Sequence, residues 1–373
     1  MESPQLVWQV PGWPEFQYEA LQIGEALAAA ERARGVIDGK LAALGFEARK
    51  QLTADAWAQE AMSTAAIEGE PLDLLAVRSS IARRLGAAPI KSTAAPRHVD
   101  GLLDVMADAV DKADTPLTDA RLQGWQAALF PTGYSGLRQI RAGAYRTHTG
   151  PMQIVSGPVG RETVHYEAPA SAAVPAQMAA FLAWANDANA EPSAVVKAAL
   201  AHLWFETIHP FEDGNGRVGR AIVDLLLARE SGAASRLIRI SQRLLEKRDD
   251  YYAELSRAQH GPLDVTPWVA WFVTQVRVAC EQASATADLS LAKVRFWSEH
   301  REVDLSARQR KVVNLLLDAG PGGFEGGMST KKYEHITGAS RATSSRELIE
   351  LAALGMLVAS GAGRGTRYDV NLT

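Results

Sequence analysis

The stretch His209-Pro-Phe-Glu-Asp-Gly-Asn-Gly-Arg-Val-Gly-Arg220 places a base, carboxylates, glycines and two arginines within twelve residues. A helix-like apolar run precedes it, and residues 218–228 have the composition of a second helix. Residues 213–216 are therefore predicted to form a loop at a helix N-terminus. Gly214 and Gly216 allow positive φ and close approach, so successive backbone N–H groups can converge on an anion there. The stretch predicts a phosphate-handling site.

Each side chain in this stretch has a task that its residue type suits. His209 titrates near neutrality, so it can take a proton from an attacking hydroxyl. Asp213 offers hard oxygens that suit Mg²⁺ shared with phosphates. Arg217 and Arg220 lie three residues apart, hence on one helix face, and their guanidinium groups can fork onto phosphate oxygens. Asn215 is expected to brace the turn. The alternative is an ordinary helix connection followed by a solvated arginine pair, which has no need for this combination.

The stretch resembles the signature of the Fic (filamentation induced by cAMP) family, His-x-Phe-x-Asp/Glu-Gly-Asn-Gly-Arg-x-x-Arg, at every fixed position. The resemblance implies a protein adenylyltransferase that moves AMP from ATP to a Ser, Thr or Tyr hydroxyl of a target protein and releases pyrophosphate. The implied roles are His209 as base, Asp213 as Mg²⁺ ligand, Gly214, Asn215 and Gly216 as anion cradle, Arg217 on the α and β phosphates, and Arg220 on the γ phosphate. Related Doc kinases have Lys in place of Gly216, so this chain favours AMP transfer.

A second motif, Ser63-Thr-Ala-Ala-Ile-Glu-Gly69, predicts a buried helix near residues 56–69 that ends at Gly69. A carboxylate at Glu68 on this apolar helix would need a cation. The string from Thr64 to Gly69 resembles the Fic inhibitory motif, Ser/Thr-x-x-x-Glu-Gly/Asn. The resemblance implies that Glu68 pairs with Arg220 and blocks the productive pose of the γ phosphate. The alternative is a helix end with a solvated glutamate.

Two other functions stay open at this point. In some relatives the same glutamate positions a water that removes AMP from a modified protein, so the site could work as a phosphodiesterase. The third function class is a DNA-binding regulator whose Fic core only senses nucleotide.

Two further segments are expected near the site. Met152, Ile154 and Val155 are predicted to pair with residues 163–166 in a β-hairpin around the turn Ser156-Gly-Pro-Val-Gly160. The Fic resemblance makes this hairpin a flap for the target segment, and the alternative is a plain structural hairpin. The resemblance also implies an aromatic residue beside adenine and ribose, either Tyr251 or Tyr252. Tyr252 is preferred, and the alternative is core packing.

Composition sets limits on the class of protein. The 373 residues carry 39 basic and 43 acidic side chains, a net charge of −4 that excludes a broadly cationic nucleic-acid coat. One cysteine, Cys280, argues against a disulfide framework. No signal peptide or membrane-spanning run is apparent in the sequence, so a cytoplasmic protein without membrane contact is expected. Abundant alanine favours a mainly α fold, the Fic helical fold with a β-hairpin flap.

We expect three parts along the chain: an N-terminal helical domain over residues 1–92, a Fic catalytic domain over 93–288, and a winged helix-turn-helix domain over 289–373. The last part has a helix at 305–317, two short helices at 329–336 and 340–354, and a two-stranded tail. Arg341, Arg346, Arg364 and Arg367 are candidates for DNA contacts. The alternatives are dimerisation or presentation of substrate. A homodimer is also expected from Fic proteins with an inhibitory helix.

Overall fold

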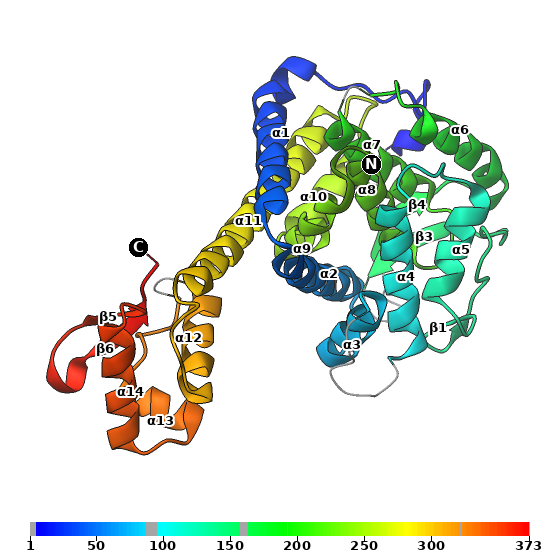
Figure 1. The fold of residues 1–373 in the computed structure, drawn as a ribbon. Coiled ribbons are helices and arrows are strands. Elements are labelled where there is room, and N and C mark those ends of the chain that lie inside the picture. The colour runs from blue at the N-terminus through cyan, green and yellow to red at the C-terminus, as the bar shows by residue number, and fades with distance from the viewer. Residues whose placement is uncertain (1–4, 87–94, 157–162, 192, 321–322, 373) are drawn as a thin grey trace. The chain divides into compact units, whose positions relative to one another are not determined.

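The computed structural model describes residues 5–86, 95–156, 163–191, 193–320 and 323–372, and these form two compact units. One unit comprises Met1–Ala42 and Arg49–Ser284, and the other comprises Ala43–Ala48 and Ala285–Thr373. The described residues are mainly helical, with small antiparallel hairpins (Figure 1), which confirms the predicted mainly α fold class. The division of the chain into three domains stays a prediction.

The first unit contains most of the helices and both hairpins next to the signature stretch. Its elements, in chain order, are α1 (Ala20–Ala43), α2 (Phe46–Ile67), α3 (Leu74–Arg84), α4 (Arg97–Asp111), α5 (Asp119–Leu129), β1 (Tyr134–Ser135), β2 (Arg138–Gln139), β3 (Met152–Ser156), β4 (Thr163–Ala168), α6 (Val174–Asn186), α7 (Ala194–Ile208), α8 (Asn215–Ser231), α9 (Ile240–Glu246) and α10 (Arg248–Gln259). Helix α11 (Thr266–Glu299) begins in this unit and ends among residues of the other.

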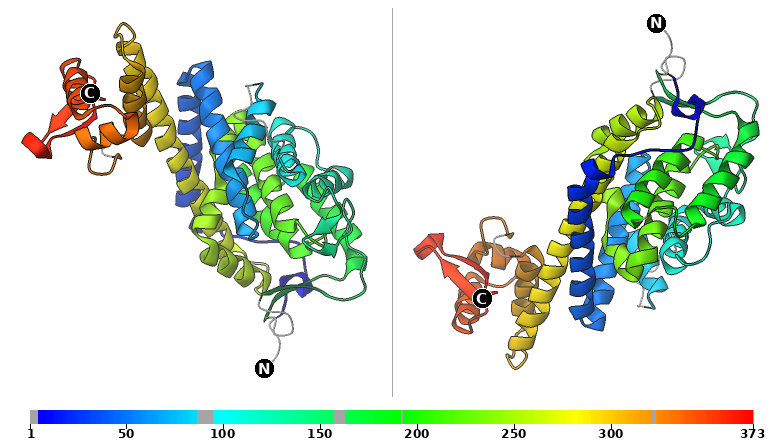
Figure 2. Two further views of the ribbon diagram at one scale, coloured as in Figure 1. Left: turned by 90° about the horizontal axis from the view of Figure 1, so that it is seen from below. Right: turned by 90° about the horizontal axis from the view of Figure 1, so that it is seen from above.

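Helix α7 forms the centre of the first unit. Its run of alanine, valine, leucine and aromatic residues is buried along its whole length, so it must be covered on every face. Figure 1 shows α7 and α8 in the middle of the unit, with α4 beside α8 and α10 beside α7. In Figure 2, α2, drawn in blue, stays beside the green helices in both views, in agreement with hydrogen bonds from α8 to Thr64. The loop that joins α7 to α8 is thereby held from several sides.

The predicted hairpin is present as strands β3 and β4. They pair antiparallel with Ile154 opposite Tyr166 and Val155 opposite Val164, and the register shifts between these pairs. The Tyr166 hydroxyl donates a 2.8 Å hydrogen bond to the carbonyl of Thr207 on α7, which ties the hairpin to the core. The predicted turn at residues 156–160 lies outside the described residues except at Ser156. The role of this hairpin as a flap stays a prediction.

The second unit has three short helices followed by a hairpin: α12 (Ala307–Ala319), α13 (Thr330–Thr337), α14 (Arg341–Ala353), β5 (Leu357–Ser360) and β6 (Arg367–Val370). A serine side chain caps each helix by accepting a hydrogen bond from the backbone N–H three residues on: Ser306, Ser329 and Ser340. The buried core includes Tyr333, whose hydroxyl donates to Glu347. This order of elements is the one predicted for a winged helix.

Several expectations for the second unit and for localisation stay predictions. Arg341 and Arg346 are exposed on α14, Arg367 is half-buried on β6, and the side chain of Arg364 lies outside the described residues. DNA binding and dimerisation stay predictions. Among the described helices, none has the length and apolar character that a membrane crossing requires.

Candidate functional site

The α7–α8 loop is a tight backbone turn between two buried helices. His209 ends α7 in the left-handed conformation, with φ 50°, and its N–H donates to the carbonyl of Phe205 at 2.9 Å. Such a φ is uncommon outside glycine and often marks a functional position. Asn215 braces the turn, since its side chain accepts from Phe211 N–H at 2.9 Å and donates to Phe211 C=O at 2.8 Å. Gly214 caps α8 with φ 86°. The turn leaves the His209 side chain 16% exposed.

A buried arginine that the sequence analysis missed fixes the start of this loop. Arg146 is 1% exposed, and its guanidinium donates to the carbonyls of His209 at 2.8 Å, Ile208 at 3.1 Å and Pro169. Its backbone N–H also donates to the carbonyl of Pro210 at 2.9 Å. Arg146 therefore links the backbone of His209 to Pro169, which follows β4. Its neighbours in the sequence, Tyr145 and Thr147, give no sign of this role.

The imidazole of His209 is held as a neutral base. Its pKa is lowered to about 4, mainly by burial and also by the charge of Arg146, against the opposite effects of a hydrogen bond with the Glu206 backbone and of the charges of Glu68 and Asp213. The carboxyl of Glu206, one turn earlier on α7, has Oε2 at 3.7 Å from His209 Nδ1. At neutral pH the ring is therefore unprotonated at one nitrogen and able to accept a proton.

Asp213 lies in the same loop with its carboxylate partly exposed. Its Oδ1 accepts from the N–H of Gly214 at 2.6 Å, and its Oδ2 accepts from the hydroxyl of Ser135 on β1. A single accessible carboxylate beside an anion site fits Mg²⁺ when phosphates supply further ligands. Among the described residues there is no group of three or more His, Cys, Asp or Glu side chains that could hold a metal by themselves. An Mg²⁺ ion bound by Asp213 would therefore need oxygens of the substrate phosphates as further ligands.

The first turn of α8 is built to receive an anion. No side chain caps the N-terminus at Gly214, so its backbone N–H groups and the positive end of the helix dipole face the loop. A Cβ at Gly214 would lie 2.8 Å from the Phe130 ring, and a Cβ at Gly216 would lie 2.3 Å from Glu68 Oε1. Close approach therefore requires glycine at Gly214, whereas at Gly216 the atom that a Cβ would meet is the end of the flexible Glu68 side chain. A glutamate oxygen already lies over this helix start.

Arg220 is buried and bound to the end of α2. Its exposed fraction is 2%, and it donates to Glu68 Oε1 at 2.6 Å, to Thr64 Oγ1 at 2.7 Å and to Thr64 C=O at 3.0 Å. Burial alone would lower the pKa of Arg220, but the charge of Glu68 and its hydrogen bond raise it above its usual value. Gly69 follows with φ 76°, and its N–H donates to Ala66 C=O. Thr64 and Glu68 of the predicted inhibitory motif therefore both contact Arg220, the last arginine of the signature.

The second signature arginine is also paired, with a residue that the sequence analysis did not select. Arg217 Nη1 donates to Glu70 Oε2 at 2.7 Å, and its guanidinium lies 4.9 Å from the centroid of the Phe130 ring. Glu70 is two residues beyond Glu68 in a short acidic segment, which was the available signal. The segment after α2 thus neutralises both arginines.

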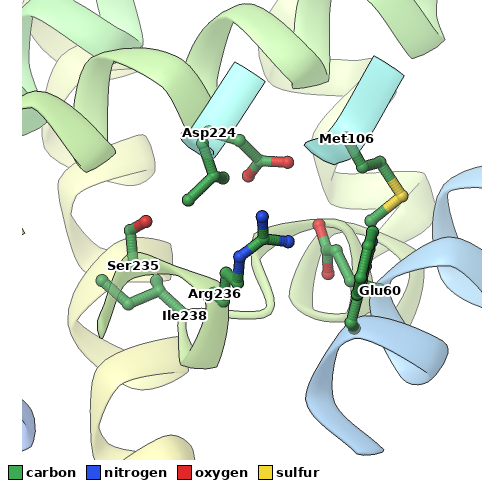
Figure 3. Close-up of a pocket in the computed structure, with 8 residues that line it drawn as sticks. Glu60, Met106, Asp224, Ser235, Arg236 and Ile238 are labelled. Carbon is green, nitrogen blue, oxygen red and sulfur yellow. The ribbon is translucent and has the colours of Figure 1, made fainter. Parts of the chain in front are cut away.

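Contacts between α2 and α8 continue away from the loop. Glu60 and Thr64 on α2 and Glu68 directly after its last residue are spaced by four residues, hence on one face. Residues 216, 220 and 224 on α8 have the same spacing. Figure 3 shows the far end, where the guanidinium of Arg236 points into the space between the carboxylates of Asp224 and Glu60.

Glu60 and Asp224 line a cavity of about 20 Å³. The carboxylate of Glu60 accepts the backbone N–H groups of Ser241 at 2.7 Å and Gln242 at 3.2 Å. Burial raises the pKa of both carboxyl groups, and the charge of Glu60 raises that of Asp224 further. The contact face of α2 therefore extends about one turn beyond the inhibitory motif.

The two candidate adenine-site tyrosines differ in burial. Tyr251 is 2% exposed and its hydroxyl meets His202 Nε2 at 2.9 Å, so it belongs to the core. Tyr252 is 41% exposed, and the guanidinium of Arg248 lies 5.5 Å from its ring centroid. Arg248 in turn donates to the carbonyl of Ile67 at the end of α2. Of the pair, Tyr252 is the exposed residue.

Comparison with known proteins identifies two segments of the chain. Residues 116–227 match the Fic/DOC family, and residues 6–87 match a domain of unknown function, DUF4172. The first match extends from the approach to α5 through the α7–α8 loop and most of α8, so it contains the signature and both of its arginines. The fold and this loop define a Fic domain. The chain therefore contains a Fic/DOC family domain at residues 116–227.

Its relatives carry adenylyltransferase names. The chain is 28% identical over 225 residues to the protein adenylyltransferase Fic of Nematostella vectensis, covering 59% of this chain and 47% of that protein. It is 41% identical over 71 residues to a probable protein adenylyltransferase of Aquifex aeolicus (strain VF5), covering 19% of this chain and 20% of that protein. The chain thus spans less than half the length of these curated relatives.

Two solved structures share the fold. A Fic family protein from Desulfovibrio desulfuricans G20 aligns with a TM-score of 0.52 at 21% identity, covering 92% of this chain and 95% of that chain. Fic-1 (residues 134–508) from C. elegans aligns with a TM-score of 0.53 at 21% identity, covering 72% of this chain and 75% of that chain. These likenesses support the Fic fold.

Proposed function

We propose that this chain is a protein adenylyltransferase that transfers AMP from ATP to a hydroxyl of a target protein and is inhibited by its own α2. The observation that carries the proposal is the α7–α8 loop, which joins a neutral base, an accessible carboxylate and an uncapped helix start to two arginines. Relatives named adenylyltransferases support the same chemistry.

The reaction uses each group once. His209 takes the proton from a Ser, Thr or Tyr hydroxyl, and the hydroxyl oxygen attacks the α phosphorus of ATP. The bond from this phosphorus to the bridging oxygen breaks, and pyrophosphate leaves. Residues 214–216 hold phosphate oxygens through backbone N–H groups, while Arg217 and Arg220 offset their charge. Mg²⁺, held by Asp213, would neutralise charge on the phosphates when bound.

Inhibition follows from competition for one guanidinium. Arg220 cannot bind the γ phosphate while it donates to Glu68 and Thr64, and the Glu68 carboxylate adds negative charge over the helix start. Two anions in the same low-dielectric place repel each other. The described arrangement is therefore the inhibited form of the proposed enzyme.

The position of Glu68 also favours a second candidate function at this site. Its carboxylate reaches the cradle at Gly216, where a water could be held against the phosphorus of an AMP-modified residue. Such a water would release AMP, so the phosphodiesterase reading remains the alternative. Release of AMP from a modified target by the wild type, lost in Glu68→Gly, would favour it.

The test follows label from α-labelled ATP into protein in the presence of Mg²⁺. Wild type, Glu68→Gly and Glu68→Gly/His209→Ala are compared, with Glu47→Gly at the exposed start of α2 as matched control. Strong labelling only in Glu68→Gly is expected, because release of Arg220 exposes the site and loss of the base stops the reaction. Absence of labelling in every variant, with target proteins supplied from a cell extract, would overturn the proposal.

A further inference from the structure

The short β1–β2 hairpin contacts the α7–α8 loop and has no task in the reaction proposed above. Its strands pair Ser135 opposite Arg138 across a two-residue turn. Residues directly opposite each other in an antiparallel pair share one face of the hairpin. Arg138 Nη2 donates to the carbonyl of Glu212 at 2.9 Å. The Ser135 hydroxyl donates to Oδ2 of Asp213. One face of the hairpin therefore holds two consecutive residues of the loop.

The main chain of Asp213 is held independently of this hairpin. Gln126 on α5 is fully buried, and its Nε2 donates to the carbonyl of Asp213 at 3.2 Å. Its Oε1 accepts from the N–H of Gly143 at 2.6 Å, which fixes the orientation of the amide. Because Gln126 holds the backbone, loss of the Ser135 hydroxyl would free the side chain of Asp213 and leave the loop in place.

Both oxygens of the Asp213 carboxylate accept a hydrogen bond. Oδ1 accepts from the N–H of Gly214 at 2.6 Å, and Oδ2 accepts from Ser135. Two bonds to different oxygens fix the plane of the carboxylate, whereas the bond from Gly214 alone would leave it free to turn about Oδ1. An ionised carboxylate has about four acceptor sites, so each oxygen keeps one for a further partner.

The free acceptor sites of Asp213 are accessible and lie beside the proposed phosphate site. The side chain is 36% exposed, and its Oδ1 is 4.0 Å from Nη2 of Arg217 on the first turn of α8. Hard oxygens in this place suit Mg²⁺ that is shared with phosphates. The orientation in which Asp213 meets such an ion is therefore the one that Ser135 and Gly214 fix.

We propose that Ser135 is a positioning residue of the transferase, which holds the Asp213 carboxylate in the orientation that binds Mg²⁺ together with the nucleotide. The proposal deepens the proposed function and rests on it. Ser135 touches neither the ion nor the phosphates in this scheme, and it acts through Asp213. Removal of a hydrogen-bond partner that orients a metal ligand costs about 10- to 100-fold in metal affinity or activity.

The test measures the Mg²⁺ concentration that gives half of the maximal labelling rate, in the Glu68→Gly background at a fixed concentration of ATP. Ser135→Ala should raise this concentration about 10- to 100-fold, with most of the rate restored at saturating Mg²⁺. Ser135→Thr keeps a hydroxyl and should stay close to the parent. Tyr134→Phe, which removes a hydroxyl from the neighbouring, 48% exposed hairpin residue, is the matched control. A Ser135→Ala rate that is unchanged, or that falls equally at every Mg²⁺ concentration, would overturn the proposal.

A binding measurement separates this proposal from the proposed function. In Glu68→Gly/His209→Ala, which lacks the base, calorimetry gives the affinity for ATP with and without Mg²⁺ and without transfer. We expect Mg²⁺ to tighten ATP binding, and we expect Ser135→Ala to remove most of this gain, as Asp213→Ala does, while Ser135→Thr keeps it.

An equal gain with and without the Ser135 hydroxyl would overturn the role of Ser135, as would the absence of any gain in the parent. A gain that is lost in Ser135→Ala, while no variant labels protein, would refute the transferase and support the positioning of Asp213.

Discussion

Replacing Thr64 with valine should release the inhibited site without removing any charge. Valine keeps the shape of threonine, so the change deletes one hydrogen bond, the 2.7 Å bond that Thr64 Oγ1 accepts from Arg220 Nε. The guanidinium keeps its bonds to Glu68 and to the Thr64 carbonyl. In the closed form Nε would then be buried without a partner, because Arg220 is only 2% exposed.

The expected size of the effect follows from this one bond. A hydrogen bond to a charged group contributes about 1.5–3 kcal/mol, and its loss is confined to the closed form. Since about 1.4 kcal/mol is a factor of ten, the open fraction and the labelling rate should rise about 10- to 150-fold. The rate cannot exceed that of Glu68→Gly, in which the carboxylate is gone.

The assay is the same transfer of label from α-labelled ATP, run on Thr64→Val, Glu68→Gly and wild type. Ser63→Ala alters the neighbouring buried residue of α2, which has no part in the contact with Arg220, and should behave as wild type. The reasoning is refuted if Thr64→Val labels no faster than wild type while Glu68→Gly labels strongly. That result would mean that the Thr64 hydroxyl adds nothing to closure.

Three further predictions address the second arginine, the loop and the base. Glu70→Gln should raise labelling less than tenfold, because the Glu70 side chain is 47% exposed and such pairs contribute about 0–1 kcal/mol; a rise equal to that of Glu68→Gly would contradict this. Gly214→Ala should lower the melting temperature more than Gly133→Ala. Both glycines have positive φ, but only at Gly214 would a Cβ meet a ring, at 2.8 Å. Equal decreases in melting temperature would show that the positive φ alone, and not the contact with the ring, causes the effect. The labelling rate should stay constant between about pH 7 and about pH 5, because burial keeps the pKa of His209 at about 4 and the ring stays a free base. A decline centred near the ordinary histidine pKa would refute the last prediction.

The sequence predicts the parts of the site that depend on short-range geometry. The signature fixes its own turn, since the Asn215 side chain binds the backbone of Phe211 four positions earlier and Gly214 adopts a positive φ. The pairing of Glu68 with Arg220 could be anticipated because a carboxylate on an apolar helix requires a cation, and the family resemblance indicated which one. The mainly helical fold follows from the long alanine-rich and leucine-rich runs.

The missed residues depend on packing between distant segments. Glu70 and Arg217 are 147 positions apart, and the acidic segment around Glu70 does not by itself indicate which cation it pairs with. In the sequence, nothing distinguishes Arg146 from the other arginines. Its role is visible only in the structure, where its guanidinium donates to three backbone carbonyls.

The triple contact of Arg220 with α2 makes helix and nucleotide mutually exclusive occupants in the proposed enzyme. By linkage, the apparent nucleotide affinity is then the intrinsic affinity multiplied by the fraction of molecules in which Arg220 is free of its contacts with α2. Each kcal/mol that holds the helix therefore weakens apparent binding by the same amount. Nucleotide at high concentration, or a target that binds the released form, becomes an activator by mass action alone.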